Sequence, residues 1–483
     1  LYFNLNYIMD TTKIHAIGCD LSGTKTGSIV EQISRLKSLA FPVVCLPDIH
    51  VKDRTEGPSS FAAATEGTLV PDLTAPSVGC GMAVVATHLV KDQANEKFFQ
   101  DFFRAMRQEL GPNYGIFRNF LLMLGVIKRP RKRYDLTDAE LEAVLKDGAA
   151  AAVKKYGLPE TILDKIEYRG SKFTEEEKAK VNLYDILPPI SFRSGKHNLG
   201  YGFKGNHFIE IQYVEEILDE VAAGAAGLAK NQIVIMYHGG GGAVPYHVGR
   251  FYGNRKKNTP KKFFLLLMKL WFHLASFEGL KNIRTRLRYY FWPRTFTEIP
   301  ADSLEGKRIL FATKTALNYS YAFRVATVAR IQDALQKTLG GEAAKLELIT
   351  DIIHNSIVKE NIKGKDVYVH RHTANRIFPG KLTIVSGYNN TSSYLALGLE
   401  NTENTLFSAD HGAGETIKRI HREGGSGAHP EKLKTYFYKS SEMHKTEIEH
   451  ITDEGIELIL NHLQNEKVIK PVVRLRPIAV FKG

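Results

Sequence analysis

Residues 232–242 read QIVIMYHGGGG, and this stretch decides the fold class that we expect. Its unbroken run of β-branched, apolar and aromatic side chains is typical of a strand that is buried on both faces. His238 and the four glycines after it end the run abruptly, as happens where a strand leads into a turn. Similar runs predict further strands at 43–46, 83–90, 208–214, 382–386 and 472–480.

Helical patterns lie between these runs. Residues 91–186 are rich in Lys, Glu and Ala, residues 313–337 carry Ala, Leu and Val at helical spacing, and we also predict a helix over 346–357. After 43–46, Pro47 predicts a change from strand to loop. Because strands and helices are interspersed without strict alternation, we predict an α+β fold. No repeat or linker marks a domain boundary.

Composition narrows the class of protein. Of 483 residues, 43% are hydrophobic and 24% charged, which excludes a disordered, collagen-like or disulfide-scaffold chain. The net charge of +13 favours an anionic partner such as nucleic acid, nucleotide or an acidic membrane surface. Three widely spaced cysteines and the lack of a signal-peptide pattern predict a reducing, cytoplasmic location. Residues 1–8 precede Met9, and we interpret them as tag or upstream residues.

A basic, apolar segment at about 255–300 stands out from the rest of the chain. Residues 262–275 read KFFLLLMKLWFHLA, and the apolar stretch of about 13 residues is shorter than the roughly 20 that a membrane-spanning helix needs. We therefore predict no transmembrane segment. We favour an inserted helix packed on the body, and the alternative is a basic amphipathic helix on a membrane or on RNA.

Several histidines and one cysteine lie beside glycines at the ends of predicted strands. A strand fixes the direction of such a side chain, and the glycines let a metal or phosphate approach the backbone. A single histidine of this kind is more often structural, but a set of imidazoles and a thiolate suits Mn, Zn or Fe. The set comprises Cys80, His207, His238, His354 and His411.

An ordered series of motifs runs from about residue 40 to the end of the chain. Its members are LPDIH (46–50), VGCGM (78–82), GNHFIEIQ (205–212), HGGGG (238–242), LNYSYAFR (317–324), HN (354–355), HRHTANRIFP (370–379), GYNNTSSY (387–394), DHGAGE (410–415) and PIAVFKG (477–483). In this order the motifs resemble those of the RtcB family of RNA ligases. The resemblance implies one large catalytic domain over 9–483, with central β-sheets flanked by helices, a metal and nucleotide cleft, a mainly helical insert at about 91–186 and the basic amphipathic insert at about 255–300.

The resemblance also implies a reaction. Family members use GTP and one or two Mn²⁺ ions, form a GMP-histidine intermediate, and join an RNA 3′-phosphate or 2′,3′-cyclic-phosphate end to a 5′-hydroxyl end. It further suggests archease as an activating partner. By position, the nucleophile is His411 and the aspartate that orients it is Asp48. The metal ligands are Cys80, His207, His238 and His354, and the nucleotide contacts are Asn206, Glu210, Arg376 and Lys482.

The chain departs from the family pattern at residues that would face phosphate or metal. Ser77 replaces the aspartate of the cysteine motif, and a hydroxyl is a poorer ligand for a hard cation than a carboxylate. Gly242 and Glu415 stand where the family has arginines. His372 replaces a lysine and Tyr388 a serine. These losses leave two alternatives open, a metal-dependent phosphoesterase and an RNA-end binding protein that has lost ligation.

Overall fold

The structure is a computed structural model that describes residues 11–53, 55–108, 121, 132–201, 205–253, 263–275, 278, 280–292, 295–439 and 444–482. Residues 1–8, which we interpret as tag or upstream residues, lie outside the described residues. Parts of the predicted insert at about 255–300 also lie outside them. Within the described residues, no helix is long and apolar enough to span a membrane.

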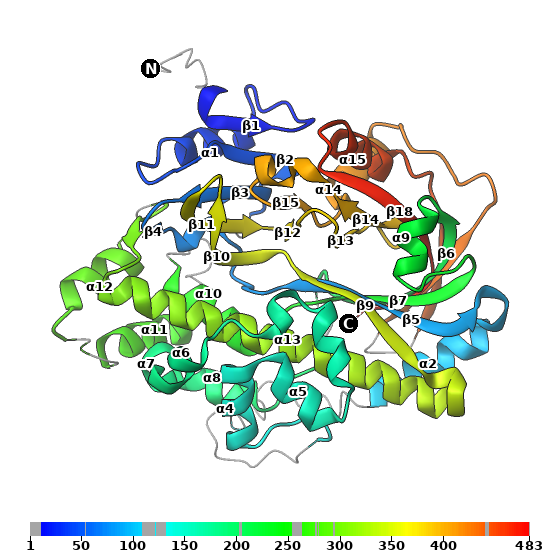
Figure 1. Ribbon diagram of the computed structural model, residues 1–483, viewed down its shortest axis with the longest axis horizontal. Coiled ribbons are helices and arrows are strands. Elements are labelled where there is room, and N and C mark those ends of the chain that lie inside the picture. The colour runs from blue at the N-terminus through cyan, green and yellow to red at the C-terminus, as the bar shows by residue number, and fades with distance from the viewer. Residues whose placement is uncertain are drawn as a thin grey trace.

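A nine-stranded sheet forms one half of the β-structure (Figure 1). Its strands follow the order β13-β14-β18-β6-β7-β5-β9, and β16 and β17 join it through β18. The bounds are β5 (Gly81–Val90), β6 (Phe208–Ile217), β7 (Gln232–Gly239), β9 (Leu346–Ile353), β13 (Leu382–Val385), β14 (Ser393–Gly398), β16 (Lys434–Lys439), β17 (Lys445–Glu449) and β18 (Ile469–Lys482). The pairings are antiparallel except for β16 with β18.

A five-stranded sheet in the order β1-β2-β3-β11-β10 forms the other half, and two strand pairs complete the β-structure. The bounds are β1 (Ile14–Ala16), β2 (Val43–His50), β3 (Ser59–Thr65), β10 (Asn355–Ile362) and β11 (Lys365–His372), with β12 (Ala374–Arg376) pairing β15 (Ser408–Asp410) and β4 (Thr68–Leu69) pairing β8 (Ile299–Pro300).

Most helices gather on one side of the sheets, around the long helix α13, whereas α1, α14 and α15 lie on the opposite side (Figure 1). The bounds are α1 (Lys25–Ser34), α2 (Glu96–Gln108), α4 (Asp138–Asp147), α5 (Ala149–Tyr156), α6 (Glu175–Lys180), α7 (Leu183–Ile186), α8 (Pro189–Gly195), α9 (Glu220–Ala225), α10 (Ala243–Tyr252), α11 (Phe263–Ala275), α12 (Ile283–Tyr290), α13 (Leu304–Thr338), α14 (Gly414–Arg422) and α15 (Glu454–Asn465). The predicted α+β class is confirmed.

The central strands are buried on both faces, as their continuous apolar runs predict. On β5, Ala83 and Val85 pack into the core beneath α13, whereas Met82 and Val84 pack into a second core on the other face of the sheet. Period-2 alternation of a strand places successive side chains on opposite faces, so both layers need apolar residues. The strands predicted at 83–90, 208–214, 232–237, 382–386 and 472–480 and the helix at 313–337 are confirmed.

Two local predictions are wrong. Residues 346–357 form strand β9 and the start of β10 instead of a helix, because β9 pairs with β5 and β10 pairs with β11. The stretch contains four Ile residues, whose branched side chains suit a pleated surface once partner strands are present. Pro47 does not end the first strand either. β2 continues to His50, with an irregular register between Cys45 and His50 that accommodates the missing N–H.

Candidate active site

Three potential metal ligands converge where three neighbouring strands begin or end. Cys80 immediately precedes β5, His207 immediately precedes β6, and His238 lies near the end of β7 between them. The Cys80 Sγ atom is 3.4 Å from His207 Nε2 and 3.3 Å from His238 Nε2. All three ligand atoms lie within 4.8 Å of one another, which is a spacing that one metal ion can bridge.

A fourth imidazole, that of His354 between β9 and β10, joins this group. The backbone N–H of His354 donates to the Cys80 carbonyl at 2.9 Å, and the His354 and His238 Nε2 atoms lie 3.3 Å apart. The backbone carbonyl of Asn206 lies 3.2 Å from His238 Nδ1 and accepts its proton. That bond leaves the Nε2 lone pair of His238 directed at the cluster, which is the tautomer that a metal ligand needs.

Burial keeps this cluster uncharged in the absence of an ion. It raises the pKa of Cys80 to about 12 and lowers the pKa values of His238 and His354 well below the ordinary range. Neutral imidazoles are the form that binds metal, whereas the thiol has to lose its proton to do so. A cation bound here would supply the charge that favours this thiolate.

Glycines after β7 let the chain pass close to the cluster. A side chain at Gly240 would place its Cβ 2.5 Å from His207 Cε1. Gly242 has φ +77°, and a Cβ there would lie 2.6 Å from Asn198 Oδ1. This backbone geometry favours glycine over any residue with a side chain at position 242.

A buried ion pair supports the loop that carries Cys80. Arg324 on α13 binds Asp351 on β9, with Nε 2.7 Å from Oδ1, and its Nη1 donates to the Gly79 carbonyl at 2.8 Å. Both side chains are almost fully buried. Arg324 therefore fixes the position of Cys80 relative to β9, a structural role that its place in the LNYSYAFR motif did not reveal.

His411 follows β15 and lies beside the cluster. Its ring centroid is 4.6 Å from that of His354 and 6.3 Å from that of His238. Its Nδ1 atom is buried without a hydrogen-bond partner. Burial, reinforced by the positive charge of Lys52, lowers the pKa of His411 to about 3, so the ring is neutral near pH 7. A neutral imidazole is the nucleophilic form.

A cavity of about 630 Å³ opens beside this ring. Six residues that the sequence singled out line it, namely Asp48, Asn206, Glu210, His238, His411 and Lys482. They come from β2, the loop before β6, β6, β7, the segment after β15, and β18. Residues separated by more than 400 positions in the sequence thus line the same cavity.

Glu210 and Lys482 form a corner of this cavity with two titratable groups. Burial raises the pKa of Glu210 to about 8, although Gln212 donates a hydrogen bond to its carboxylate and Lys482 favours its ionised form. Burial likewise lowers the pKa of Lys482. The carboxylate of Glu210 can accept hydrogen bonds from two neighbouring N–H groups of a polar ring, and the ammonium group of Lys482 lies beside it.

Asp48 contacts the helix that follows His411. Its Oδ1 accepts hydrogen bonds from the backbone N–H and the hydroxyl of Thr416, each at 2.7 Å, in the first turn of α14. Burial raises the pKa of Asp48, and His50 and these hydrogen bonds oppose the shift. Asp48 therefore anchors α14, and with it the segment 411–414, to β2.

Arg376 is not brought to the cavity. Its Nε donates to Glu360 Oε1 at 2.6 Å, and its guanidinium lies over the rings of Phe378 and Tyr168. Glu360 also pairs with the buried Arg371, so the three charges form a network between β10, β11 and β12. The assignment of Arg376 as a nucleotide contact stays a prediction, and its contacts in this structure are those of the network.

Two lysines that the sequence did not single out line the same cavity. Lys52 lies four residues after Asp48, and Lys418 is on α14. Among the departures from the family pattern, Glu415 and Tyr388 also line it, and Glu415 pairs with Arg422 at 3.3 Å. The place of Lys52 two residues after the LPDIH motif is the one sequence signal that could have suggested it.

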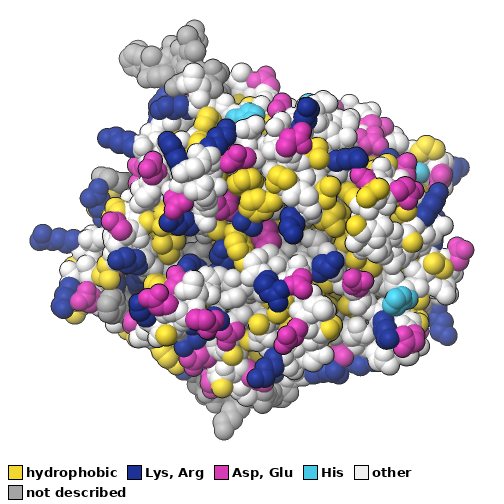
Figure 2. All heavy atoms as spheres, in the orientation of Figure 1, with side chains coloured by type: hydrophobic (Ala, Val, Ile, Leu, Met, Phe, Trp, Pro, Cys, Tyr) yellow, Lys and Arg dark blue, Asp and Glu magenta, His cyan; other side chains and the backbone are white. Residues whose placement is uncertain are grey.

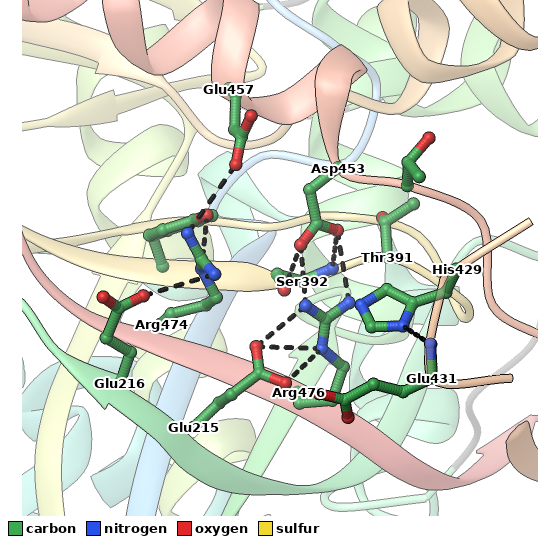
Figure 3. Close-up of polar contacts among 12 residues, drawn as sticks. Glu215, Glu216, Thr391, Ser392, His429, Glu431, Asp453, Glu457, Arg474 and Arg476 are labelled. Atoms are coloured by element: carbon green, nitrogen blue, oxygen red, sulfur yellow. Dashed lines mark hydrogen bonds and ion pairs between the residues drawn. The ribbon is translucent and has the colours of Figure 1, made fainter. Parts of the chain in front are cut away.

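The loop that carries Tyr388 is fixed by a buried arginine (Figure 3). Arg476 on β18 binds Glu215 on one side and Asp453 on the other, with closest N–O distances of 2.8 Å to each. Asp453 in turn accepts hydrogen bonds from the backbone N–H and hydroxyl of Ser392, at 2.8 and 2.7 Å. The cavity wall at 387–389 is thus tied to the central sheet.

The chain is similar to known proteins over most of its length. The family model described as "tRNA-splicing ligase RtcB" matches residues 29–483. A tRNA-splicing ligase RtcB of Thermococcus kodakarensis is 25% identical over 87% of this chain and 83% of its own length. For the proteins of the same name from Methanococcus maripaludis and Aeropyrum pernix, the identities are 29% and 24%, over 75% and 94% of this chain and 70% and 93% of their own lengths. The chain therefore belongs to the RtcB family.

Proposed function

We propose that this protein is an RNA ligase that joins a 3′-phosphate or 2′,3′-cyclic-phosphate end to a 5′-hydroxyl end through a GMP-histidine intermediate. The observation that supports this most directly is the neutral, half-buried His411 at the wall of a cavity beside the Cys80–His207–His238 cluster. A nucleophile next to a metal-binding group and an open cavity is the arrangement that nucleotidyl transfer requires.

The lining residues suggest how GTP would lie in the cavity. The carboxylate of Glu210 accepts hydrogen bonds from the paired N–H groups of guanine, and Lys482 lies beside it. With the base in this corner, the triphosphate extends toward His411, Lys52 and Lys418. The two lysines take the place of the arginines that the chain lacks at Gly242 and Glu415.

The residues present fit a divalent metal such as Mn²⁺. Cys80, His207 and His238, with His354 adjacent, provide one thiolate and three imidazoles, a donor set that suits borderline transition metals. A bound cation would neutralise phosphate charge and favour the in-line geometry for attack by His411. Ser77 adds only a hydroxyl near Cys80, so one fully ligated ion fits this donor set better than two.

The proposed ligation proceeds in three steps. An imidazole nitrogen of His411 attacks the α-phosphorus of GTP, forming an N–P bond and releasing pyrophosphate. The RNA 3′-phosphate then attacks the same phosphorus, which breaks the N–P bond and leaves a 3′-phosphate joined to GMP. A 5′-hydroxyl finally attacks the 3′-phosphate, loses its proton and expels GMP. A cyclic end first has to be opened by water.

Labelling with α-³²P-GTP and Mn²⁺ on a denaturing gel tests the proposal. We expect an acid-labile label on the wild type and none on His411→Ala. His421→Ala, an exposed histidine on α14, is the matched control and should label normally. Absence of label from the wild type at any metal, with archease added as a candidate activator, would contradict the ligase proposal.

A second candidate is a metal-dependent phosphoesterase that opens cyclic phosphates without GTP. The observation in its favour is Glu415, whose negative charge lines the cavity where the family has an arginine. Hydrolysis of a cyclic-phosphate RNA by the wild type and by His411→Ala alike, without GTP, would support this candidate. RNA binding with neither activity would instead identify an RNA-end binding protein.

A further inference from the structure

Helices α11 and α12 form a hairpin whose inner face is fixed to the body of the protein. Lys269 on α11 donates to the carbonyls of Gly253 and Tyr290, at 2.7 and 3.0 Å. His273 is fully buried and its ring stacks on that of Tyr290, with centroids 3.9 Å apart. On α12, the buried Arg286 binds Glu305 of α13 at 2.6 Å. The hairpin is therefore a fixed part of the surface, as the prediction of a helix packed on the body requires.

The outer face of the same hairpin exposes large apolar side chains. Phe263, Leu267 and Trp271 follow one another at four-residue spacing on α11, and their exposed fractions are 68%, 47% and 57%. Leu280, Leu287 and Trp292 add 76%, 38% and 60%. We call these six residues the apolar face. Elsewhere in the described chain, large exposed apolar side chains are scattered along the sequence. Six exposed large apolar side chains within one segment of the chain are typical of an interaction surface.

The segment of sequence that carries the apolar face is strongly basic. The stretch 254–294 contains eleven Lys and Arg residues and a single acid, Glu278, so it carries +10 of the chain's net charge of +13. Of its described members, Lys281, Arg284 and Arg288 are exposed beside the apolar residues. In Figure 1, α12 and the sheet strand β6 lie at opposite ends of the long axis. Figure 2 shows Lys and Arg side chains projecting along the edge where α12 lies.

We propose that the apolar face docks on an anionic lipid surface, with Leu, Phe and Trp inserted among the acyl chains and the basic side chains on the headgroups. Aliphatic and aromatic residues on one helix face, flanked by Lys and Arg, are the composition of an interfacial membrane helix. Single-stranded RNA would use the aromatic rings for stacking but gains nothing from Leu267, Leu280 and Leu287. The three exposed leucines therefore favour lipid over RNA.

Intrinsic tryptophan fluorescence can test this proposal without an added label. The two tryptophans of the chain, Trp271 and Trp292, both belong to the apolar face, so intrinsic tryptophan fluorescence reports on this surface alone. The full-length protein is titrated with phosphatidylcholine vesicles, with or without about 30% phosphatidylserine. We expect a blue shift of the emission and co-flotation with the anionic vesicles only, both weakened by salt.

Paired variants locate the contact. Phe263→Ser/Leu267→Ser retains both tryptophans and should weaken vesicle binding by about tenfold or more, because two apolar side chains no longer insert. Arg284→Gln/Arg288→Gln should weaken binding to anionic vesicles. Val221→Ser on α9, which removes an 84% exposed apolar side chain at a distant site, is the matched control and should bind like the wild type.

Three results would overturn the proposal: no spectral shift with any vesicle, equal binding of the Phe263→Ser/Leu267→Ser variant, or a shift with single-stranded RNA but not with lipid. The last result would assign the surface to RNA. Thermal unfolding of each variant guards against misfolding, and GTP labelling, whose residues lie elsewhere, should be unchanged in all of them.

Discussion

The carboxylate of Asp48 on β2 and the first turn of α14 are joined by two hydrogen bonds to Thr416, each 2.7 Å long. His411 lies five residues before Thr416, between the end of β15 and the start of α14. The nucleophile proposed here is thus held from both sides, by a strand pair and by a capped helix. Asp48 thereby ties the five-stranded sheet to this segment.

Substitution of Asp48 separates two roles for this residue. Asp48→Asn keeps an oxygen that accepts from Thr416, so we expect the free energy of unfolding to fall by no more than about 1 kcal/mol. If the carboxylate also orients the His411 ring, the same variant loses most of its GMP label. Thr416→Val removes one hydrogen bond without changing charge and should label at a rate within about tenfold of the wild type. Full labelling of Asp48→Asn would restrict Asp48 to anchoring α14.

Metal binding is expected to depend on Cys80 and not on the other buried cysteine. Cys80→Ala removes the thiolate from the cluster, and we expect loss of tightly bound Mn²⁺ or Zn²⁺, measured by elemental analysis after gel filtration. Cys45→Ala is the matched control because Cys45 is also buried but lies in an apolar core. That variant should lose stability while retaining metal. Equal metal content in the two variants would show that the cluster is not the binding site.

The phosphate-binding role proposed for Lys52 and Lys418 predicts changes in KM. Lys52→Met or Lys418→Met should raise the KM for GTP in the labelling reaction by about tenfold, because each removes a cation from the cavity. Lys381→Met, an exposed lysine outside the cavity, serves as the control. Conversely, Glu415→Arg restores the family's cation and should lower the KM. A KM unaffected by all three cavity substitutions would place the phosphates elsewhere.

The sequence predicted several residues that line the cavity, but it did not predict all of the strand pairings that bring them together. The glycine-flanked His238 and the terminal Lys482 were found because short motifs keep strand ends and their side chains together. His354 was assigned to the cluster but placed on a helix, since the pairing of β9 with β5 depends on residues over 250 positions away. The ion pair of Arg376 with Glu360 on β10 is not visible in the motif that contains Arg376, and the role of Arg376 as a nucleotide contact stays a prediction. Lys52 has no motif of its own, and only the folded cavity shows where it lies.

Recognition of guanine by Glu210 predicts a pH dependence. Because burial raises its pKa to about 8, the carboxyl group of the empty cavity is mostly protonated at pH 7 and ionises above pH 8. An ionised carboxylate accepts both N–H groups of guanine, so the KM for GTP should fall as the pH rises from 7 to 9. Glu210→Gln should have a higher KM that no longer changes over this range. A parallel pH dependence in the variant would assign the titration to another group.

Stability in mild acid is expected to depend on His370, a buried histidine remote from the proposed chemistry. Its Nε2 accepts a hydrogen bond from the Val70 backbone N–H at 2.9 Å, and burial lowers its pKa to about 4, compared with 6.5 in the unfolded chain. Between these values only the unfolded state binds the proton, so the folded state loses stability as the pH falls from 6.5 toward 4. At pH 5 this loss of folding free energy amounts to about 2 kcal/mol.

The variant His370→Gln tests this expectation. Its side chain retains an acceptor for the Val70 N–H but does not titrate. The decrease in urea-unfolding free energy from pH 7 to pH 5 should therefore be about 2 kcal/mol smaller than in the wild type. The exposed His421→Gln should show the full wild-type decrease, and an equal decrease in His370→Gln would mean that another group is responsible.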